Sequence, residues 1–161
     1  MFLKALLSFA ALPGVVAFLV PAFIATFSPS PSNPSVLACA TAAFGIGVLL
    51  WCVWAFYSAG KGTLAPWSPP KYLVTIGLYR ISRNPMYVGV ALVLVGWSWY
   101  FESPAMCVYT ACVIVAFHLR VVFGEEPWLA RTHGQAWQKY KGSAPRWLGA
   151  VRWARHEKRD A

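Results

Sequence analysis

Two long stretches of this sequence are almost free of charge, and they constrain the fold more than any other feature. Between Phe2 and Phe27 only Lys4 is charged, and no charged residue occurs from Val36 to Gly60. Roughly 20 residues of apolar helix are enough to cross the hydrocarbon core of a bilayer. Only 12% of the 161 residues are charged, about half the share that is usual in soluble proteins. The sequence therefore predicts an all-α integral membrane protein.

The apolar segments divide into four predicted transmembrane helices, which cover residues 2–27, 36–59, 86–101 and 104–123. The segment 28–35 between the first two is too rich in proline to be helical. Only Glu102 and Ser103 separate the last two helices, so we expect these to form a helical hairpin. Gly45 and Gly47 in the second helix favour close packing of another helix over the approach of a ligand.

Basic residues indicate how these helices are oriented. Thirteen of the 14 lysines and arginines lie near the N-terminus, in the loop 60–84 or after residue 123, and the two opposite loops contain none. The remaining one, Arg120, lies near the same end of the fourth helix. Loops rich in lysine and arginine stay in the cytoplasm. We therefore expect a multi-pass protein with both termini and the long loop on the cytoplasmic side.

Neither nucleic acid nor metal is an expected partner. The net charge is +9, but the chain has no helix-turn-helix, zinc-finger or RNA-binding signature. The cysteines lie inside apolar runs without metal-ligand or CxxC spacing. We expect them to be small buried apolar residues: Cys39, Cys52, Cys107 and Cys112.

The loop from Gly60 to Asn84 mixes turn residues with apolar ones, and we expect it to be partly embedded at the membrane interface. It ends in Arg83-Asn84-Pro85-Met86-Tyr87, directly before the third predicted span. Ordinary anchoring explains these five residues as well as a ligand site does. Arginine reaches the interface, proline starts a helix, and tyrosine marks the boundary.

The adjacent acids Glu125 and Glu126 follow the fourth predicted span. Two carboxylates at a membrane boundary repel each other and are costly to desolvate. The helix that starts at Pro127 accounts for one of them, because acidic residues suit the positive end of a helix. With His118 and Arg120 one or two turns earlier, they form a candidate functional site.

Residues 127–140 predict an amphipathic helix. Leu129, Ala136, Trp137 and Tyr140 recur at helical spacing, and basic or polar residues form the opposite stripe. Such a helix is expected to lie on the membrane surface, with its apolar residues either packed or interfacial. The basic tail beyond it is expected to contact anionic head groups.

Three stretches in this order resemble the membrane-embedded isoprenylcysteine carboxyl methyltransferase and phospholipid N-methyltransferase superfamily. They are residues 77–87 ending in Arg-Asn-Pro-x-Tyr, residues 125–129 (Glu-Glu-Pro-Trp-Leu), and Gly134, Trp137, Tyr140 with Pro145-Arg146. Their order and spacing around a helical hairpin make the combination specific. The resemblance implies N-terminal helices in 1–59, a methyltransferase core in 60–147 and a basic tail in 148–161.

The resemblance also implies S-adenosyl-L-methionine as methyl donor, bound by the C-terminal part next to the membrane. No G-x-G-x-x-G stretch indicates a Rossmann site instead. We expect Arg83 to pair with the donor's carboxylate and one glutamate to accept hydrogen bonds from its ribose or amino group. The donor-binding residues implied are Arg83, Asn84, Pro85, Tyr87, Glu125, Glu126, Leu129 and Tyr140.

The expected acceptor is a lipid or a prenylated small molecule, and its reacting group is open. A prenylcysteine-like carboxylate needs no base and could be oriented by Arg120; we favour this reading. The amine of a phosphatidylethanolamine-type lipid must first lose a proton, to Glu125, Glu126 or His133. The expected catalytic residues are Arg120, Glu125 and Glu126. A non-catalytic four-helix membrane protein fits less well, because transporters place ionisable residues near the membrane midplane.

Overall fold

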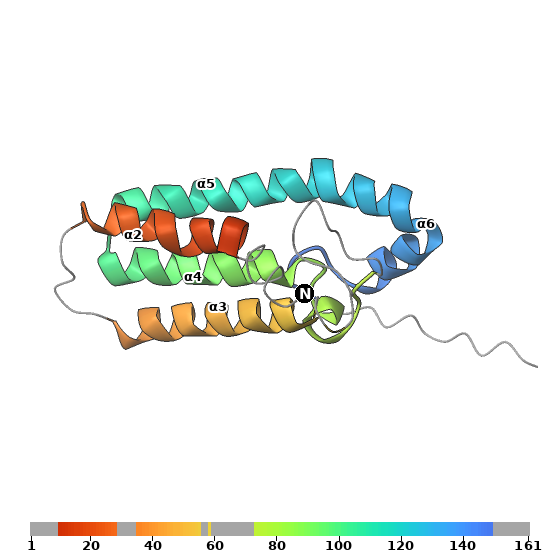
Figure 1. Ribbon diagram of the computed structural model, residues 1–161, viewed down its shortest axis with the longest axis horizontal. Helices are drawn as coiled ribbons and strands as arrows, with labels where there is room; N and C mark the ends of the chain where they lie inside the picture. The colour runs from red at the N-terminus through yellow and green to blue at the C-terminus, as the bar shows by residue number, and fades with distance from the viewer. Residues whose placement is uncertain (1–9, 29–34, 56–57, 59–72, 150–161) are drawn as a thin grey trace, which may run out of the picture.

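The computed structural model describes residues 10–28, 35–55, 58 and 73–149 (Figure 1). Within them the regular elements are all helical, which confirms the all-α prediction for this part of the chain. Two segments, η1 and η4, are π-helical, and η3 is a short 3-10 helix. In chain order the elements are η1 (Ala10–Leu19), α2 (Val20–Ala25), α3 (Val36–Ala55), η3 (Gly77–Arg80), α4 (Pro85–Phe101), α5 (Pro104–Arg120), η4 (Val121–Glu125) and α6 (Glu126–Ser143).

Two helices are long and apolar enough to cross a membrane: α3 and the continuous helix that starts at Pro104. The helices Pro13–Ala25 and Pro85–Phe101 are also apolar but shorter. At 1.5 Å per residue the 17 residues of α4 extend about 25 Å, slightly less than the hydrocarbon core of a bilayer. Residues 2–9 of the first predicted span lie outside the described part. The count of four spans therefore stays a prediction.

Glycines allow α3 and α4 to pack closely. A Cβ atom added at Gly45 would lie 2.8 Å from the carbonyl oxygen of Gly89. One added at Gly96 would lie 2.7 Å from the Cβ of Ala42. Backbones approach this closely only where one residue lacks a side chain. The packing role predicted for Gly45 is confirmed, whereas no described atom lies within 4 Å of a Cβ added at Gly47.

α4 and α5 form an antiparallel hairpin and pack against each other, and α2 lies in front of the gap between them in the view of Figure 1. Glu102 reverses the chain in a left-handed conformation with φ of 48°. Between the two helices, Ser98 Oγ and Thr110 Oγ1 are hydrogen-bonded at 2.8 Å. The hydroxyl of Ser28 donates to Ser103 Oγ at 3.0 Å, which brings the end of α2 to the same end of the bundle.

At the opposite end, α5 continues through the π-helical η4 into α6 without a break. The sequence predicts a new helix at Pro127 instead. Proline has no backbone N–H, and its ring clashes with the preceding turn of a regular α-helix. The wider π turn directly before Pro127 relieves that clash, so the helix can continue.

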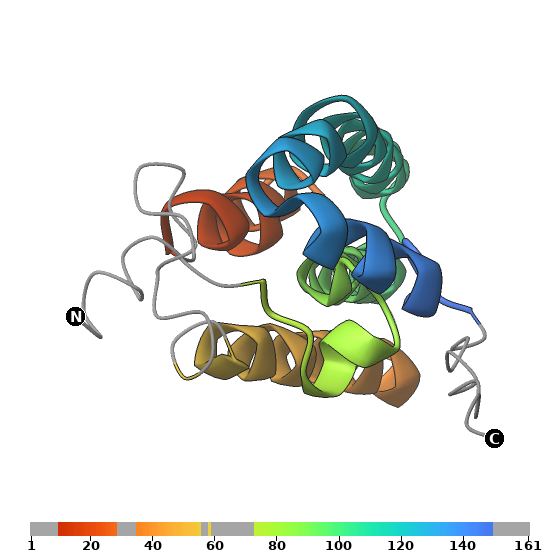
Figure 2. The ribbon, with the colours of Figure 1, turned by 90° about the vertical axis from the view of Figure 1, so that its right-hand side faces the viewer.

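α6 bends at Gly134, where φ is 47° and ψ is −118°, a backbone conformation that suits only glycine. Beyond the bend, Trp137 and Tyr140 are 2% and 7% exposed. They pack with Ala144 and with Leu73 from the chain before η3. The apolar face of this part therefore packs against protein, one of the two roles, packed or interfacial, that the helical spacing predicts. Figure 2 shows α6 lying across the start of α4 and next to η3.

Part of the predicted interfacial loop also belongs to the core. Val74 and Tyr79 are buried against Cys52 and Ala55 of α3, while residues 60–72 lie outside the described part. The cysteine prediction is wrong for three of the four: Cys39, Cys107 and Cys112 are exposed and only Cys52 is buried. A small bundle has more apolar surface than interior, so small apolar residues also cover its outer faces.

The described basic residues gather at the α6 end of the bundle, in or beside η3, η4 and α6. Lys4, Lys61, Lys71 and the basic residues from 152 onward lie outside the described part. The tight connection at Glu102 lies at the other end. Which end faces the cytoplasm stays a prediction.

Candidate functional site

The segment that links η3 to α4 is fastened to the chain after α6. The backbone N–H of Arg83 donates to the carbonyl oxygen of Pro145 at 2.8 Å. The side-chain amide of Asn84 donates to the carbonyl oxygen of Arg146 at 2.9 Å. Two of the stretches singled out in the sequence are thus held together at one end of the bundle, the end that faces the viewer in Figure 2.

Glu126 is enclosed by two arginines. Its Oε1 lies 2.7 Å from Arg146 Nε and 3.2 Å from Arg83 Nη1, and its Oε2 accepts from Arg146 Nη2 at 3.0 Å. The side chain of Glu126 is only 11% exposed. Burial raises the pKa of Glu126, but the hydrogen bonds from Arg146 and the charge of Arg83 outweigh burial and lower it overall. Glu126 is therefore an ion-pair partner and a poor base.

Arg83 is the most enclosed cation of this cluster, with 8% of its side chain exposed. Its guanidinium carbon lies 5.3 Å from the centre of the Trp137 ring, within the range of a cation–π contact. Its Nε and Nη1 have no hydrogen-bond partner among the described residues, since the approach to Glu126 lacks hydrogen-bond geometry. Burial lowers the pKa of Arg83. Buried donors without partners are costly, and an anionic ligand would satisfy them.

Glu125 has different partners. Its Oε1 accepts hydrogen bonds from the hydroxyl of Tyr87 and, at 3.0 Å, from Arg120 Nε. Arg120 Nε also lies 3.1 Å from the Tyr87 hydroxyl oxygen. The side chains of Glu125 and Arg120 are 32% and 48% exposed. This second cluster is therefore far more open than the one around Glu126.

The π-helical η4 explains why Arg120 and Glu125 meet. In an α-helix the neighbours along one face are three or four residues apart, whereas the π-helix brings residues five apart into register. Arg120 directly precedes η4 and Glu125, five residues later, is its last residue. The wider turn thus brings the side chain of Glu125 next to that of Arg120. The next residue, Glu126, then points toward Arg83.

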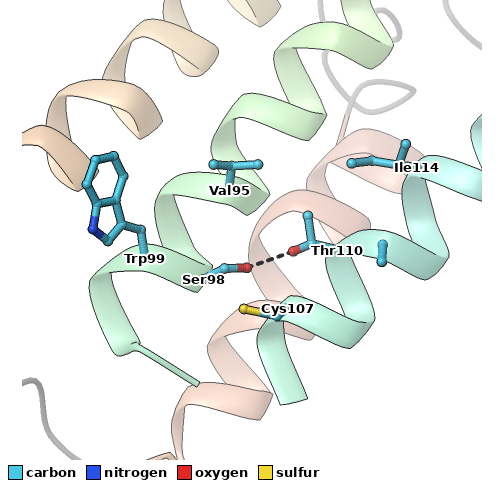
Figure 3. Close-up of a pocket in the computed structure, with 7 residues that line it drawn as sticks. Val95, Ser98, Trp99, Cys107, Thr110 and Ile114 are labelled. Atoms are coloured by element: carbon cyan, nitrogen blue, oxygen red, sulfur yellow. Dashed lines mark hydrogen bonds between the residues drawn. The ribbon is translucent and has the colours of Figure 1, made fainter. Parts of the chain in front are cut away.

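An apolar groove begins beside Tyr87 and runs between α4 and α5. It has a volume of about 450 Å³, and His118 and Trp147 line the same end as Tyr87. A second hollow of about 400 Å³ continues along the two helices (Figure 3) and shares Val95 and Ile114 with the first. The groove therefore extends from the polar clusters toward the far end of the bundle.

The structure brings together most, but not all, of the residues predicted for the site. Arg83 and Asn84 meet Glu126 and Arg146, and Tyr87 meets Arg120 and Glu125. Pro85 is buried as the first residue of α4. Leu129 packs beneath the Trp137 cluster, and Tyr140 donates to the carbonyl oxygen of Tyr79 at 2.7 Å. These three shape the surroundings of the ion pairs.

Other residues of the site were not assigned a role from the sequence. The sequence indicates Arg146 only through the Pro145-Arg146 motif, which follows the acidic pair along the chain. The helical spacing predicts Trp137 only as an apolar position. No sequence pattern predicts the contact between Trp147 and His118. His133, considered as a base, stands edge-on to Trp128, and its Nε2 is buried without a hydrogen-bond partner among the described residues.

A comparison with family models matches residues 34–136 to the phospholipid methyltransferase family. The match covers nearly two thirds of the chain, from α3 to the second half of α6. It includes Glu125, Glu126 and the Arg83–Tyr87 segment. The chain belongs to the phospholipid methyltransferase family. No curated protein and no solved structure gives a significant match.

Membership in the phospholipid methyltransferase family implies a membrane methyltransferase that acts on a lipid-like substrate. It agrees with the resemblance found in the sequence and counts against a non-catalytic membrane protein. Within the described residues no group of three or more His, Cys, Asp or Glu could hold a metal ion.

Proposed function

We propose that this phospholipid methyltransferase family member transfers a methyl group from S-adenosyl-L-methionine to the amine of a phospholipid-like acceptor, at the cytoplasmic side of a four-span membrane protein. The observation that carries the proposal is the contrast between the two adjacent acids. Glu126 is enclosed with Arg83 and Arg146, whereas Glu125 accepts a hydrogen bond from Tyr87, which lines an apolar groove. One side suits a polar donor and the other a lipid acceptor.

The cluster around Glu126 fits the donor. When bound, S-adenosyl-L-methionine supplies a methyl group on a positively charged sulfur. Arg83 Nε and Nη1, which make no hydrogen bond to a described residue, would bind the donor's carboxylate in a charge-assisted pair. Glu126 would hold Arg83 in place and accept a hydrogen bond from the ribose or amino group. Asn84 would act indirectly, because its amide already holds the carbonyl of Arg146.

The remaining motif residues would form the walls of the donor site. Pro85 fixes the first turn of α4, while Leu129 and Tyr140 support the ring of Trp137 from behind. Burial raises the pKa of Tyr140, so its hydroxyl remains a donor to Tyr79. Such positioning is the main requirement of methyl transfer, which needs no nucleophile from the enzyme.

Glu125 is the residue placed to assist an amine acceptor. Its Oε1 is held by Tyr87 and Arg120, and its Oε2 has no hydrogen-bond partner among the described residues. The free oxygen would take a proton from the acceptor's ammonium group, which leaves the nitrogen lone pair for attack on the methyl carbon. Tyr87 and Arg120 would keep the carboxylate pointing toward the groove.

A prenylcysteine-like carboxylate is the second candidate acceptor, and Arg120 is the observation that favours it. Neither terminal nitrogen of Arg120 is hydrogen-bonded to another described residue, because only Nε contacts Tyr87 and Glu125. Two parallel N–H groups suit a carboxylate. Glu125 beside it would repel that carboxylate, which is why the amine is preferred.

Calorimetric titration with S-adenosylhomocysteine tests the donor site. We expect the purified protein to bind and Arg83→Ala to weaken binding at least tenfold, since charge-assisted hydrogen bonds to a carboxylate would be lost. Arg131→Ala is the matched control, because Arg131 is exposed on α6 without an ion pair to a described residue. No binding by the wild type, or equal binding by both variants, would refute the donor site.

A second experiment tests the acceptor. Incubation with methyl-labelled donor and either phosphatidylethanolamine vesicles or a prenylated cysteine gives a methylamine or a methyl ester. Alkaline hydrolysis releases labelled methanol only from the ester. We expect label that resists alkali, and exclusively alkali-labile label would establish the carboxylate instead.

A further inference from the structure

The chain directly after α6 reaches both parts of the proposed site. We call its residues 144–147 the strap. Within the strap, Arg146 turns its side chain to the enclosed cluster, where its Nε and Nη2 donate to the two carboxylate oxygens of Glu126. The next residue, Trp147, lines the apolar groove and stacks on His118. Two consecutive residues of the strap therefore contact the enclosed cluster and the groove.

The segment before α4 holds the backbone of the strap. The backbone N–H of Arg83 donates to the carbonyl oxygen of Pro145 at 2.8 Å. The carbonyl oxygen of Arg146 accepts from Asn84 Nδ2 at 2.9 Å and from Ser82 Oγ at 3.5 Å. Ser82 is buried, and its Oγ also accepts the backbone N–H of Asn84 at 3.1 Å. Three residues in a row thus clasp two successive carbonyls of the strap.

Helix capping does not explain the asparagine in this clasp. Asn84 is the N-cap residue of α4, but its side chain makes no capping hydrogen bond to the first turn of that helix. Asparagine is common at N-caps because its side-chain oxygen usually accepts such a bond. Here the amide nitrogen donates to the strap instead. The side chain of Asn84 therefore supports the strap and not the helix.

The clasp lies at the centre of the strap. At the start of the strap, Ala144 is buried against Trp137, and directly after its end Leu148 is 71% exposed. Between these positions the side chains of Arg146 and Trp147 point to different partners. Both are carried by one short piece of backbone, so a displacement of that backbone would move both together.

We infer that Asn84 is a positioning residue that holds the strap, and that the strap couples the donor cluster to the apolar groove. A donor bound at Glu126 would steady Arg146 and, through the backbone, Trp147. Binding at one site should therefore favour binding at the other. The identity of the two ligands rests on the proposed function, whereas the clasp rests only on the contacts above. This role differs from the direct contact with the donor that the resemblance implies for Asn84.

Hydrogen–deuterium exchange of Asn84→Asp tests the clasp. Aspartate caps a helix as well as asparagine does, but its carboxylate has no N–H for the carbonyl of Arg146. We expect the amides of the strap to exchange about tenfold faster than in the wild type, because the hydrogen bond is lost and two oxygens face each other. Exchange in α4 should not change.

Two further variants at the same position complete this experiment. Asn84→His retains an N–H donor and should recover part of the protection. Asn84→Ala deletes the hydrogen bond without adding a charge and should show a smaller increase than Asn84→Asp in the same amides. An unchanged strap in Asn84→Asp and Asn84→Ala, or equally faster exchange in α4, would refute the clasp.

Calorimetric titration with S-adenosylhomocysteine tests the coupling. Asn84→Asp should weaken binding about tenfold. Trp147→Ala changes only the groove end of the strap, and we expect it to weaken binding about fivefold, the lower end of usual coupling between sites. Leu148→Ala is the matched control, because this neighbouring apolar side chain is 71% exposed, and its affinity should equal that of the wild type.

The outcomes separate the coupling from the donor site. Equal affinity of Trp147→Ala and the wild type would refute the coupling and leave the donor site intact. No binding by the wild type would refute the donor site and the coupling with it, while the exchange experiment would still decide whether Asn84 holds the strap.

Discussion

Glu125 and Glu126 are neighbours in the chain, and their surroundings are opposite. Glu126 is 11% exposed and contacts Arg83 and Arg146, and the aromatic ring of Trp137 covers Arg83. Glu125 is 32% exposed and contacts Arg120 and Tyr87, and Tyr87 lines an apolar groove. The first cluster is enclosed, and the second is more exposed.

This difference would let one helix serve the two proposed ligands. Consecutive residues of a helix point in directions about 100° apart, so adjacent acids reach different neighbours. Separate partners also remove the repulsion between the two carboxylates, because each has its own arginine. In the proposed function the enclosed cluster would hold the charged donor and the open one would receive the lipid acceptor, with methyl transfer between them.

The largest effect is expected from Glu126→Gln. The change leaves Arg83 and Arg146 without a counter-charge, and we expect a loss of about 3 kcal/mol in unfolding free energy, the lower end for a buried pair because Arg146 is 33% exposed. Binding of S-adenosylhomocysteine should disappear. Thermal unfolding in detergent and calorimetry measure the two effects. Unchanged stability with unchanged binding would mean that the enclosed cluster is not a donor site.

Glu125→Gln should separate activity from stability. Removal of a general base typically lowers kcat about 100-fold, whereas the exposed pair with Arg120 contributes less than about 1 kcal/mol to folding. We therefore expect a large loss of turnover on an amine acceptor, with S-adenosylhomocysteine affinity within about twofold of the wild type. A matching loss of donor affinity would contradict the division between the two clusters.

Gly77→Ala should disturb the enclosed cluster around Glu126 indirectly, through η3. Gly77 has φ of 53°, and a Cβ there would lie 2.0 Å from the ring of Trp51. Strain and overpacking together should cost about 2 kcal/mol of stability and shift η3, which precedes Arg83. Gly142→Ala is the control, because no described atom lies within 4 Å of a Cβ at that glycine. Equal melting temperatures for the two variants would argue against this support role.

The smallest effect concerns pH. Burial raises the pKa of Glu126, but Arg146 and Arg83 lower it overall, below the ordinary value of 4.5. A carboxyl whose pKa is depressed by folding stabilises the protein above its ordinary pKa, and this stabilisation is lost as pH falls through the lowered value. The wild type should lose more stability than Glu126→Gln between about pH 5 and pH 3. Parallel melting curves in that range would show that the ion pairs do not stabilise the fold.

The sequence predicted the chemistry of this end of the bundle better than its packing. The juxtaposition of Arg83 and Tyr87 with the two acids follows from a resemblance and from their place at the ends of neighbouring spans. The stacking of Trp147 on His118 could not be predicted, because contacts across 29 residues leave no periodic trace. The bend at Gly134 was missed as well, since helical spacing continues on both sides of it and only the backbone angles reveal it.

By itself the sequence determined the composition of the membrane-facing surface, the helical class and the basic end of the chain. These follow from local rules: long apolar runs must become helices in lipid, and a two-residue link between two such runs makes a hairpin. The tertiary structure alone decided which acid pairs with which arginine. That choice depends on the wider turn of η4 and on the chain after α6 returning to Arg83 and Asn84. Both depend on packing between residues far apart in the chain, and local residue types and spacing do not predict such packing.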